Sequence, residues 1–417
     1  MLPKETTNRP IRGLKTFDSL KYSAYRIYFL GMVGQWSTFS MEMVARTYLV
    51  YDITGSAAKL GIMSLANAVP TIVFSLIGGA IADRLAKKYL IIIAQIAMML
   101  VSLSYGIAVH VGYLTSAHPE SWWVLVAGSA VLGTITAMSM PARQAIINEL
   151  VRAEHIMNAV SLGTLGMSLF QLIGPATAGF IIDAYGYATI FYIMAALNAS
   201  GIIFAAFLPR VKPSQTHSYN VFTNIKDGLK YIVSHRTILL ILILFIASIV
   251  MAMPYQMMMP VFAKDILKVG VSGQGTLMSV AGLGALGAAL ILASLPSKKR
   301  GAILLLSNLL LGLGLVVFAF SVSWPLSLGM MVFVGIGMTG NNTAGAALMQ
   351  VYSDPAYLGR VMSVMSMSWG LSGVGAFFAG ILIEQISAPW TIGGLAICLA
   401  VISFSVFIFV SRLRKLD

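Results

Sequence analysis

Charged side chains are scarce in this chain. They make up 10% of its 417 residues, with 14 Asp and Glu against 27 Lys and Arg, whereas a soluble globular domain carries about 25%. Hydrophobic residues supply 58% of the chain, and the mean hydropathy is +0.86. Because so little polar surface cannot cover a water-exposed protein of this length, we expect lipid to surround most of the fold. An ordinary soluble domain is excluded.

Several kinds of chemistry also lack the residues that they need. The one cysteine, Cys398, lies in an apolar run, so an intrachain disulfide is excluded. The five histidines show no metal-ligand spacing, and no phosphate-binding loop is present. We therefore expect no enzyme activity, no cofactor, no metal site and no ATP hydrolysis. The net charge of +13 is scattered over short loops rather than gathered on one domain, which argues against a nucleic-acid partner.

Long apolar runs dominate the rest of the sequence. A membrane-spanning helix needs roughly 20 mostly apolar residues, and twelve such segments can be placed, with no break long enough for a soluble domain. The sequence therefore predicts an all-α membrane protein. The segments run near residues 26–51, 59–83, 89–112, 122–145, 156–183, 187–208, 238–263, 272–295, 301–322, 325–348, 359–384 and 388–411.

The basic residues predict which way the chain faces. With both termini placed in the cytoplasm, Arg46 is intramembrane, and Lys59, Lys264 and Lys268 lie outside. Taking these four from the 27 Lys and Arg leaves 23 on the cytoplasmic side, as the positive-inside rule requires. Four of the six Trp lie at the predicted outer edges, as an aromatic belt would place them: Trp122, Trp123, Trp324 and Trp390.

An internal repeat predicts two halves. The ten residues from Gly174 to Asp183 (GPATAGFIID) parallel those from Gly375 to Glu384 (GAFFAGILIE). Parallel repeats of six spans, with a site at their interface, are typical of alternating-access transporters. We predict an N-terminal bundle over residues 1–208, a linker over 209–237 and a C-terminal bundle over 238–417. Asp183 and Glu384 end their repeats near the outer surface; we expect an interfacial position, with gating or proton transfer as the alternative.

Apolar and basic residues recur at helical spacing within the linker. Phe222, Ile225, Leu229 and Ile232 share one face, and Lys226 and Lys230 lie on another. We interpret this pattern as an amphipathic helix that lies on the inner leaflet and joins the two halves. An ordinary solvated linker helix would show almost the same pattern.

The loop after the second predicted span carries a motif. It reads Gly79-Ala-Ile-Ala-Asp83-Arg84-Leu-Ala-Lys87-Lys88 and resembles the G-x-x-x-D-R-x-G-[RK]-[RK] signature of the major facilitator superfamily, with Ala86 in place of the usual glycine. In that family the motif latches the cytoplasmic gate in the outward-open state. The resemblance implies that Asp83 faces the positive N-terminus of another helix and that Arg84 finds a carboxylate. A plain positive-inside loop is the alternative.

The fifth predicted span looks like the antiporter motif of the same superfamily, in degenerate form. The matching residues are Gly166, Gly174, Pro175 and Gly179. Small residues allow close helix contact, and a proline removes one backbone hydrogen bond, so the span can bend. The family associates this motif with exporters.

Two longer stretches narrow the resemblance. LVYDITGS from Leu49 and PYQMMMPVFAKD from Pro254 look like the drug-exporter branch that includes macrolide-efflux and enterobactin-export proteins. The resemblance covers essentially the whole chain. It implies two pseudo-symmetric six-helix bundles in a bacterial cytoplasmic (inner) membrane.

Two charges lie well inside a predicted span. Glu42 and Arg46 are one turn apart on the same helix face. Removal from water favours the neutral acid, while the neighbouring cation favours the carboxylate, so this pair is our candidate for proton coupling. A structural ion pair, or Arg46 extending toward water, is the alternative. Farther along, Arg143 is expected to orient its helix or to bind Glu149 or a lipid phosphate.

Residues of two predicted spans are candidates for lining a cavity. Met is abundant, at 25 residues, and flexible thioethers suit varied apolar ligands. Most of these Met are expected to pack or to face lipid, and a copper path is disfavoured because no His or Cys cluster accompanies them. The candidates are Gln35 and Phe39 in the first span and Tyr255, Gln256 and Met257 in the seventh.

These features together predict a secondary active exporter. We expect it to move amphipathic or hydrophobic small molecules of the drug, macrolide or siderophore class, by proton antiport and alternating access, and to function as a monomer in the lipid bilayer. A flippase for lipids or lysolipids is one alternative. A membrane sensor that kept the fold and lost transport is another.

Overall fold

The computed structural model describes residues 15–84, 86–209, 221–294 and 298–416, without the side chains of 15–16, 76–84 and 221–225. This part of the chain is helical, with no β-strand. The elements are η1 (Lys15–Lys21), α1 (Ser23–Thr54), α2 (Ala57–Arg84), α3 (Lys87–His110), η2 (Pro119–Trp122), α4 (Trp123–Leu150), η3 (Ala153–His155), α5 (Ile156–Ala206), α6 (Val221–Ser234), α7 (Arg236–Ala252), α8 (Pro254–Val261), η4 (Phe262–Ile266), α9 (Gly270–Ser294), α10 (Arg300–Phe320), α11 (Trp324–Tyr352), α12 (Leu358–Ser368), α13 (Leu371–Gln385), α14 (Ala388–Phe409) and α15 (Ser411–Arg414).

The described helices account for the twelve predicted spans. Nine stretches are long and apolar enough to cross a membrane by length and composition alone. The more polar α1 and α11 add two spans of 32 and 29 residues. The last comes from α5, whose 51 residues contain a non-helical position at Gly186 (φ 81°, ψ 170°). The prediction of an all-α, twelve-span membrane protein is confirmed.

The chain reverses direction at Gly186. Contacts of α1 show this. Successive residues of α1 meet decreasing residue numbers in the part of α5 after Gly186 and increasing residue numbers in the part before it. In order along α1, Gly31 meets Phe204, Gly34 meets Leu197, Trp36 meets Gly166 and Ser40 meets Gly174. A positive φ of this kind is open to glycine and strained for other residues. The fifth and sixth spans are therefore antiparallel neighbours joined without a loop.

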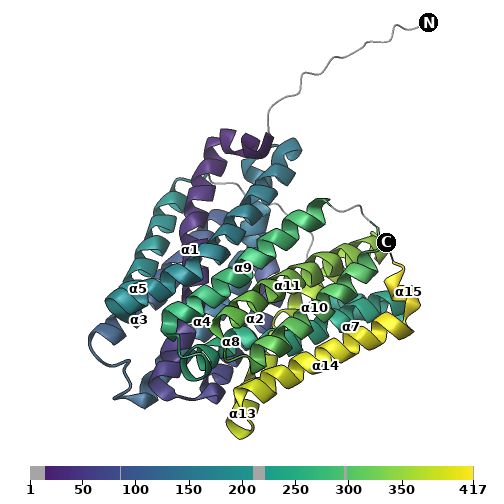
Figure 1. The fold of residues 1–417 in the computed structure, drawn as a ribbon. Helices are drawn as coiled ribbons and strands as arrows, with labels where there is room; N and C mark the ends of the chain where they lie inside the picture. Colours follow the sequence, from purple (N-terminus) through teal and green to yellow (C-terminus); the bar gives the residue numbers. More distant parts are fainter. Residues whose placement is uncertain (1–14, 85, 210–220, 295–297, 417) are drawn as a thin grey trace, which may run out of the picture.

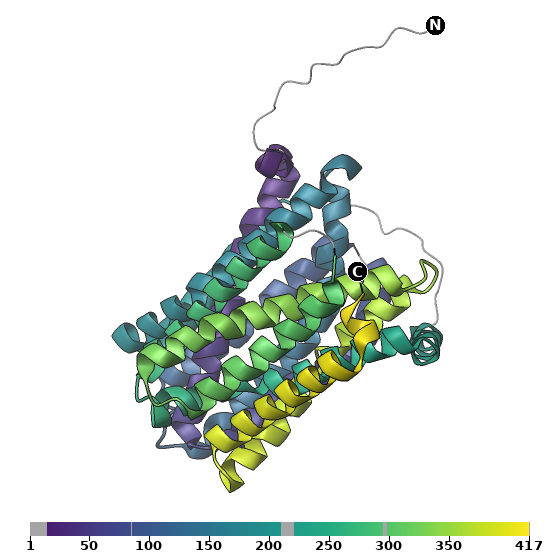
Figure 2. The same cartoon turned by 45° about the vertical axis from the view of Figure 1, so that its right-hand side comes forward.

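The spans form two groups, which we call the N-terminal half (α1–α5) and the C-terminal half (α7–α14). Inside the first, α1 and α3 pack on α5 and α2 packs on α4; inside the second, α10 packs on α11 and α14, and α11 on α9. Figure 1 shows the purple-to-teal helices of the first half meeting the green-to-yellow helices of the second, and Figure 2 shows the same two groups after a turn of 45°.

The halves pack against each other at one end, where α1 ends and α2 begins; we call it the joined end. The main pairs across the halves are α2 with α13 and α5 with α9. Close approaches occur between residues 57–72 and 370–380, and between residues 171–179 and 271–282. Toward the opposite end, Met157 of α5 and Leu290 of α9 are 78% and 69% exposed. The halves diverge there (Figure 1).

The predicted linker helix is present as α6, and it is docked on the C-terminal half. Its Asp227 pairs with Arg360 at 3.7 Å, and Tyr231 stacks on Tyr357 with ring centroids 4.3 Å apart. Ile232 is buried, whereas Leu229 is 45% exposed. The side chains of Phe222 and Ile225 lie outside the described residues. Contact with the inner leaflet stays a prediction, which the exposed Leu229 suits.

Close packing of α1 on α5 predicts the effect of a Gly174→Val substitution. A Cβ at Gly174 would lie 2.0 Å from the Oγ of Ser40, so overpacking should cost about 1–3 kcal/mol. We expect a clear fall in the thermal unfolding midpoint of the purified protein in detergent. The control is Gly287→Val, because nothing lies within 4 Å of a Cβ there. Equal midpoints for the two variants would contradict this account of the packing.

Candidate functional site

Glu42 and Arg46 form an ion pair inside the N-terminal half. The Arg46 Nη1 lies 3.2 Å from the Glu42 Oε1, and their side chains are 9% and 15% exposed, respectively. The same guanidinium donates a hydrogen bond of 2.9 Å to the Ser129 Oγ of α4. Ser129 is in turn fixed, because its hydroxyl donates to the Leu125 carbonyl oxygen at 2.6 Å. The pair is therefore held by α1 and α4 together.

The pair lies where α1 passes from exposed to enclosed surroundings. Every residue from Val44 to Tyr51 is buried, whereas Phe39, one turn before Glu42, is 57% exposed. Directly after Arg46, the Thr47 Oγ1 accepts a hydrogen bond of 3.0 Å from the Gln274 Nε2 of α9. A charge change at the pair is thus one residue away from a contact between the halves.

The five predicted cavity residues lie on neighbouring helices, since α1 packs on α8, but they differ in exposure. Gln35 and Met257 are partly buried, and Phe39 is exposed. Tyr255 is 3% exposed and belongs to the core. Gln256 donates to the Tyr255 hydroxyl at 3.4 Å and to the Met338 sulfur at 3.6 Å. In this conformation Tyr255 therefore lies beneath the exposed surface and is not part of it.

The predicted gating motif is described only in part. Gly79, Asp83 and Arg84 belong to α2, but their side chains lie outside the described residues. Lys87 pairs with Glu149 at the end of α4. Lys88 donates hydrogen bonds of 2.6 Å to the carbonyl oxygens of Ala206 and Leu208, where α5 ends. Both lysines therefore bind within their own half in this conformation.

The antiporter-like motif serves two helix contacts. Gly166 faces the Trp36 ring and Gly174 faces Ser40, so both lie against α1. At Gly179, a Cβ would lie 2.7 Å from the Ser272 Cα of α9. At Gly275 of α9, a Cβ would lie 2.2 Å from the Pro175 carbonyl oxygen. One face of the motif therefore packs inside the N-terminal half, and the other packs across the halves.

Arg143 forms no ion pair with Glu149 in the described chain, and the Glu149 carboxylate pairs with Lys87. The Arg143 side chain is 3% exposed, and its Nη1 donates to the Met32 sulfur at 3.2 Å. Among the described residues, its Nε and Nη2 have no hydrogen-bond partner. Burying a cation without hydrogen-bond partners for its nitrogens is costly, and neither the sequence nor the described residues supply these partners.

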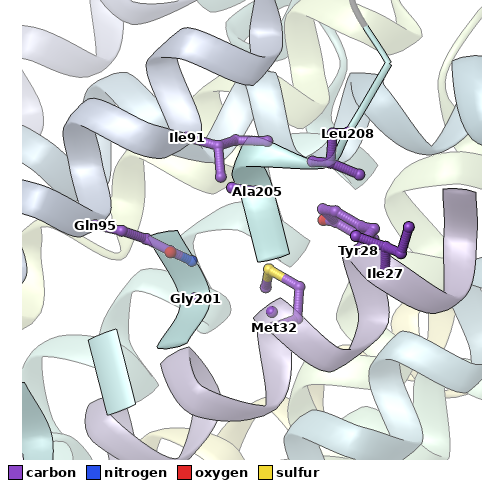
Figure 3. A pocket seen from close by; sticks show the side chains of 9 residues that line it. Ile27, Tyr28, Met32, Ile91, Gln95, Gly201, Ala205 and Leu208 are labelled. Carbon is purple, nitrogen blue, oxygen red and sulfur yellow. The ribbon is translucent and has the colours of Figure 1, made fainter. Parts of the chain in front are cut away.

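A small cavity lies beside Met32, between α1, α3 and the last part of α5. Its volume of about 10 Å³ is roughly that of one water site and far below that of an organic cargo. In Figure 3, Gln95 points toward it from α3; the Gln95 Oε1 is buried without a hydrogen-bond partner in the described chain. The lining residues are Ile27, Tyr28, Gly31, Met32, Ile91, Gln95, Gly201, Ala205 and Leu208.

The joined end holds polar contacts between the halves that sequence reasoning missed. Asp52 pairs with Lys264 at 2.5 Å, and the Tyr51 hydroxyl donates to Asp265. The partners are more than 200 residues apart in the chain. Both pairs join the two stretches that resemble drug exporters. That shared resemblance was the sequence signal that could have indicated a contact between them.

The fold and these sites define a multi-pass membrane transporter. The sequence profile described as Major Facilitator Superfamily matches residues 27–376. The chain therefore belongs to the major facilitator superfamily. As a member of this transporter family, the protein is a non-enzymatic transporter that takes a small-molecule substrate and is surrounded by lipid.

Curated relatives are similar at low identity. The Staphyloferrin A transporter of Staphylococcus aureus is 24% identical over 393 residues, 93% of this chain and 95% of its own length. The Multidrug efflux pump Tap of Mycolicibacterium fortuitum is 25% identical over 90% of this chain and 93% of its own length. The uncharacterized transporter YfiS of Bacillus subtilis, 26% identical, aligns over 43% of its own length.

Solved structures support the fold. A crystal structure of the peptide transporter POT has a TM-score of 0.74 at 15% identity, covering 95% of this chain and 96% of that one. At this identity the likeness concerns the fold alone.

The buried ion pair predicts a stability pattern. Arg46→Met leaves Glu42 buried beside no cation, so we expect a loss of about 3–5 kcal/mol, most of it regained in the double variant Glu42→Gln/Arg46→Met. Thermal unfolding of the purified variants measures both steps. As a control, Arg360→Met removes a partly exposed pair and should cost at most about 1 kcal/mol. A double variant as unstable as Arg46→Met would refute the pairing argument.

Proposed function

We propose that this protein is an exporter of amphipathic or hydrophobic small molecules that works by proton antiport. The observation that carries the proposal is the Glu42–Arg46 pair, in which the titratable Glu42 side chain, 15% exposed, lies at the boundary between the exposed and the enclosed parts of α1. Ionisable groups inside a membrane are costly and commonly mark ion or proton pathways. The relative named as a multidrug efflux pump supports export of such cargo.

We further propose alternating access, which the packing of the halves at one end supports. We assign the joined end to the outer face, with both termini in the cytoplasm, so the conformation described here is inward-facing. The positive-inside bias supports this orientation. So do Trp122, Trp123, Trp324 and Trp390, since α4, α11 and α14 begin at the joined end, at or next to these residues. The halves then correspond to residues 1–208 and 238–417, joined by the linker 209–237.

Proton binding at Glu42 would couple to this movement through α1. A neutral Glu42 no longer attracts Arg46, which is then free to bind Ser129 alone. Thr47, the next residue, contacts Gln274 of the other half, so a shift of α1 reaches the interface. In the outward-facing state, Asp83 and Arg84 would latch the cytoplasmic end, and Lys87 and Lys88 would remain with α4 and α5. The protein acts as a monomer in a bacterial cytoplasmic membrane.

A siderophore is the second candidate cargo, supported by the Staphyloferrin A transporter, which matches almost end to end. Counterflow in proteoliposomes separates the candidates when it is measured for dyes, macrolides, siderophores and lysolipids, with and without a proton gradient. Flux of lysolipids alone would indicate a flippase. Binding without flux for every class would indicate a sensor and overturn the proposal.

Glu42→Gln tests the coupling directly. The variant keeps the size of the side chain and removes its titration, so we expect proton-driven accumulation of cargo to be lost while downhill exchange continues. Proteoliposomes loaded with a fluorescent dye cargo, with and without a pH gradient, measure both. The control is Glu154→Gln, whose parent side chain is 66% exposed. Normal gradient-driven accumulation by Glu42→Gln would sink the proton role of this residue.

A further inference from the structure

The side chain of Asp183, near the end of the fifth span, contacts the backbone of the other half. Its Oδ2 accepts a hydrogen bond of 3.3 Å from the Ser272 N–H. Ser272 lies in the first turn of α9, which begins at Gly270. Backbone N–H groups in a first turn lack partners within their own helix, and the helix end carries partial positive charge. The carboxylate of one half therefore caps a helix of the other.

Glu384, near the end of α13, makes the same kind of contact in the reverse direction. Its Oε1 accepts a hydrogen bond of 3.2 Å from the Ala58 N–H and another from the Ser56 hydroxyl. Ala58 lies in the first turn of α2, which begins at Ala57. Here a carboxylate of the C-terminal half caps a helix of the N-terminal half.

The two contacts are equivalent under the internal repeat. Asp183 and Glu384 end the matched segments GPATAGFIID and GAFFAGILIE. Each acid follows a glycine by four residues, and that glycine packs on the start of the same capped helix. A Cβ at Gly179 would lie 2.7 Å from the Val271 carbonyl oxygen, and one at Gly380 would lie 2.5 Å from the Ala57 carbonyl oxygen. The glycine brings the helices together, and the acid one turn later binds the exposed N–H.

We propose that Asp183 and Glu384 are a matched pair of positioning residues for the transport cycle, each holding the joined end closed by capping the opposite half. This role rests on the alternating access proposed above and identifies two residues that control the opening of the joined end. When the halves separate at this end, both caps must break, and the two N–H groups pass to water. The inward-facing state gains from both caps, so their removal shifts the equilibrium toward the state in which the joined end is open.

Cysteine accessibility tests the pair. The parent protein carries Thr47→Cys and Cys398→Ser, because Thr47 is 0% exposed and contacts Gln274 across the halves. N-ethylmaleimide reaches this position only when the halves part, so its alkylation rate in nanodiscs reports the open population. In this parent, we expect Asp183→Ala and Glu384→Ala each to raise the rate about threefold. The double variant should raise it about tenfold, because the two caps share no partner.

Three controls make the result specific. Glu120→Ala removes another carboxylate at the joined end, 75% exposed and 3.7 Å from His118, and should leave the rate unchanged. Asp183→Glu and Glu384→Asp keep an acceptor and should recover at least part of the parent behaviour, which a merely structural role would not predict. If the double variant does not fold, the single variants decide. Rates equal to the parent, or an equal rise in Glu120→Ala, overturn the proposal.

Flux measurements on the same proteins separate this proposal from the proposed function. If the parent catalyses cargo exchange and the alanine variants alkylate at the parent rate, the caps do not hold the joined end and only the capping proposal fails. If the alanine variants alkylate faster and no cargo class is exchanged, the capping proposal stands and the export function fails.

Discussion

Backbone contact between helices, permitted by glycine, is the interaction on which this structure depends. In a bilayer, apolar surface gains little by leaving lipid for protein, so spans associate through close packing and polar contacts. Close approaches between the halves are of this kind: a Cβ at Gly275 would lie 2.2 Å from the Pro175 carbonyl oxygen, and one at Gly373 would lie 2.8 Å from that of Ser64. Larger side chains would push these helices apart. Small residues therefore determine where the two halves can pack together.

The few charges are placed where this packing leaves polar partners. Arg46 has a carboxylate and a hydroxyl within reach, and Lys264 pairs with Asp52 across the halves. Arg143 differs, because a thioether is its hydrogen-bond acceptor among the described residues. Since a buried charge is tolerated only with compensation, the pairing of the buried Arg46 has a local explanation in the fold, whereas Lys264 is partly exposed. The described surroundings of Arg143 offer its guanidinium no carboxylate or hydroxyl partner that would compensate its charge in the same way.

Much of the fold could be predicted from hydropathy alone, because a span has a fixed length and few charges. Predicted segments such as 26–51 and 388–411 lie within a few residues of α1 and α14. The Glu42–Arg46 pair was also predictable, since helical spacing places residues four apart on one face. Contacts between the halves were not, because Tyr51 and Asp265 are joined only by the docking of two bundles. Likewise, no local pattern showed that Tyr255 would be enclosed.

The interruptions of the spans are distributed unequally between the halves. In the C-terminal half, two spans are broken near mid-length, between α7 and α8 at Met253 and between α12 and α13 at Trp369 and Gly370. The N-terminal half has instead an unbroken fifth span, helical through Pro175 and tied at Gly186 directly to the sixth. Both pieces beyond the breaks, α8 and α13, touch the N-terminal half. At both breaks the backbone keeps helical dihedral angles while the hydrogen bonds tighten to three-residue spacing, as from the Gln256 N–H to Met253 and from the Gly370 N–H to Met367. Such tightened turns within a helix are common at hinges, so these two places are where the C-terminal half is expected to bend.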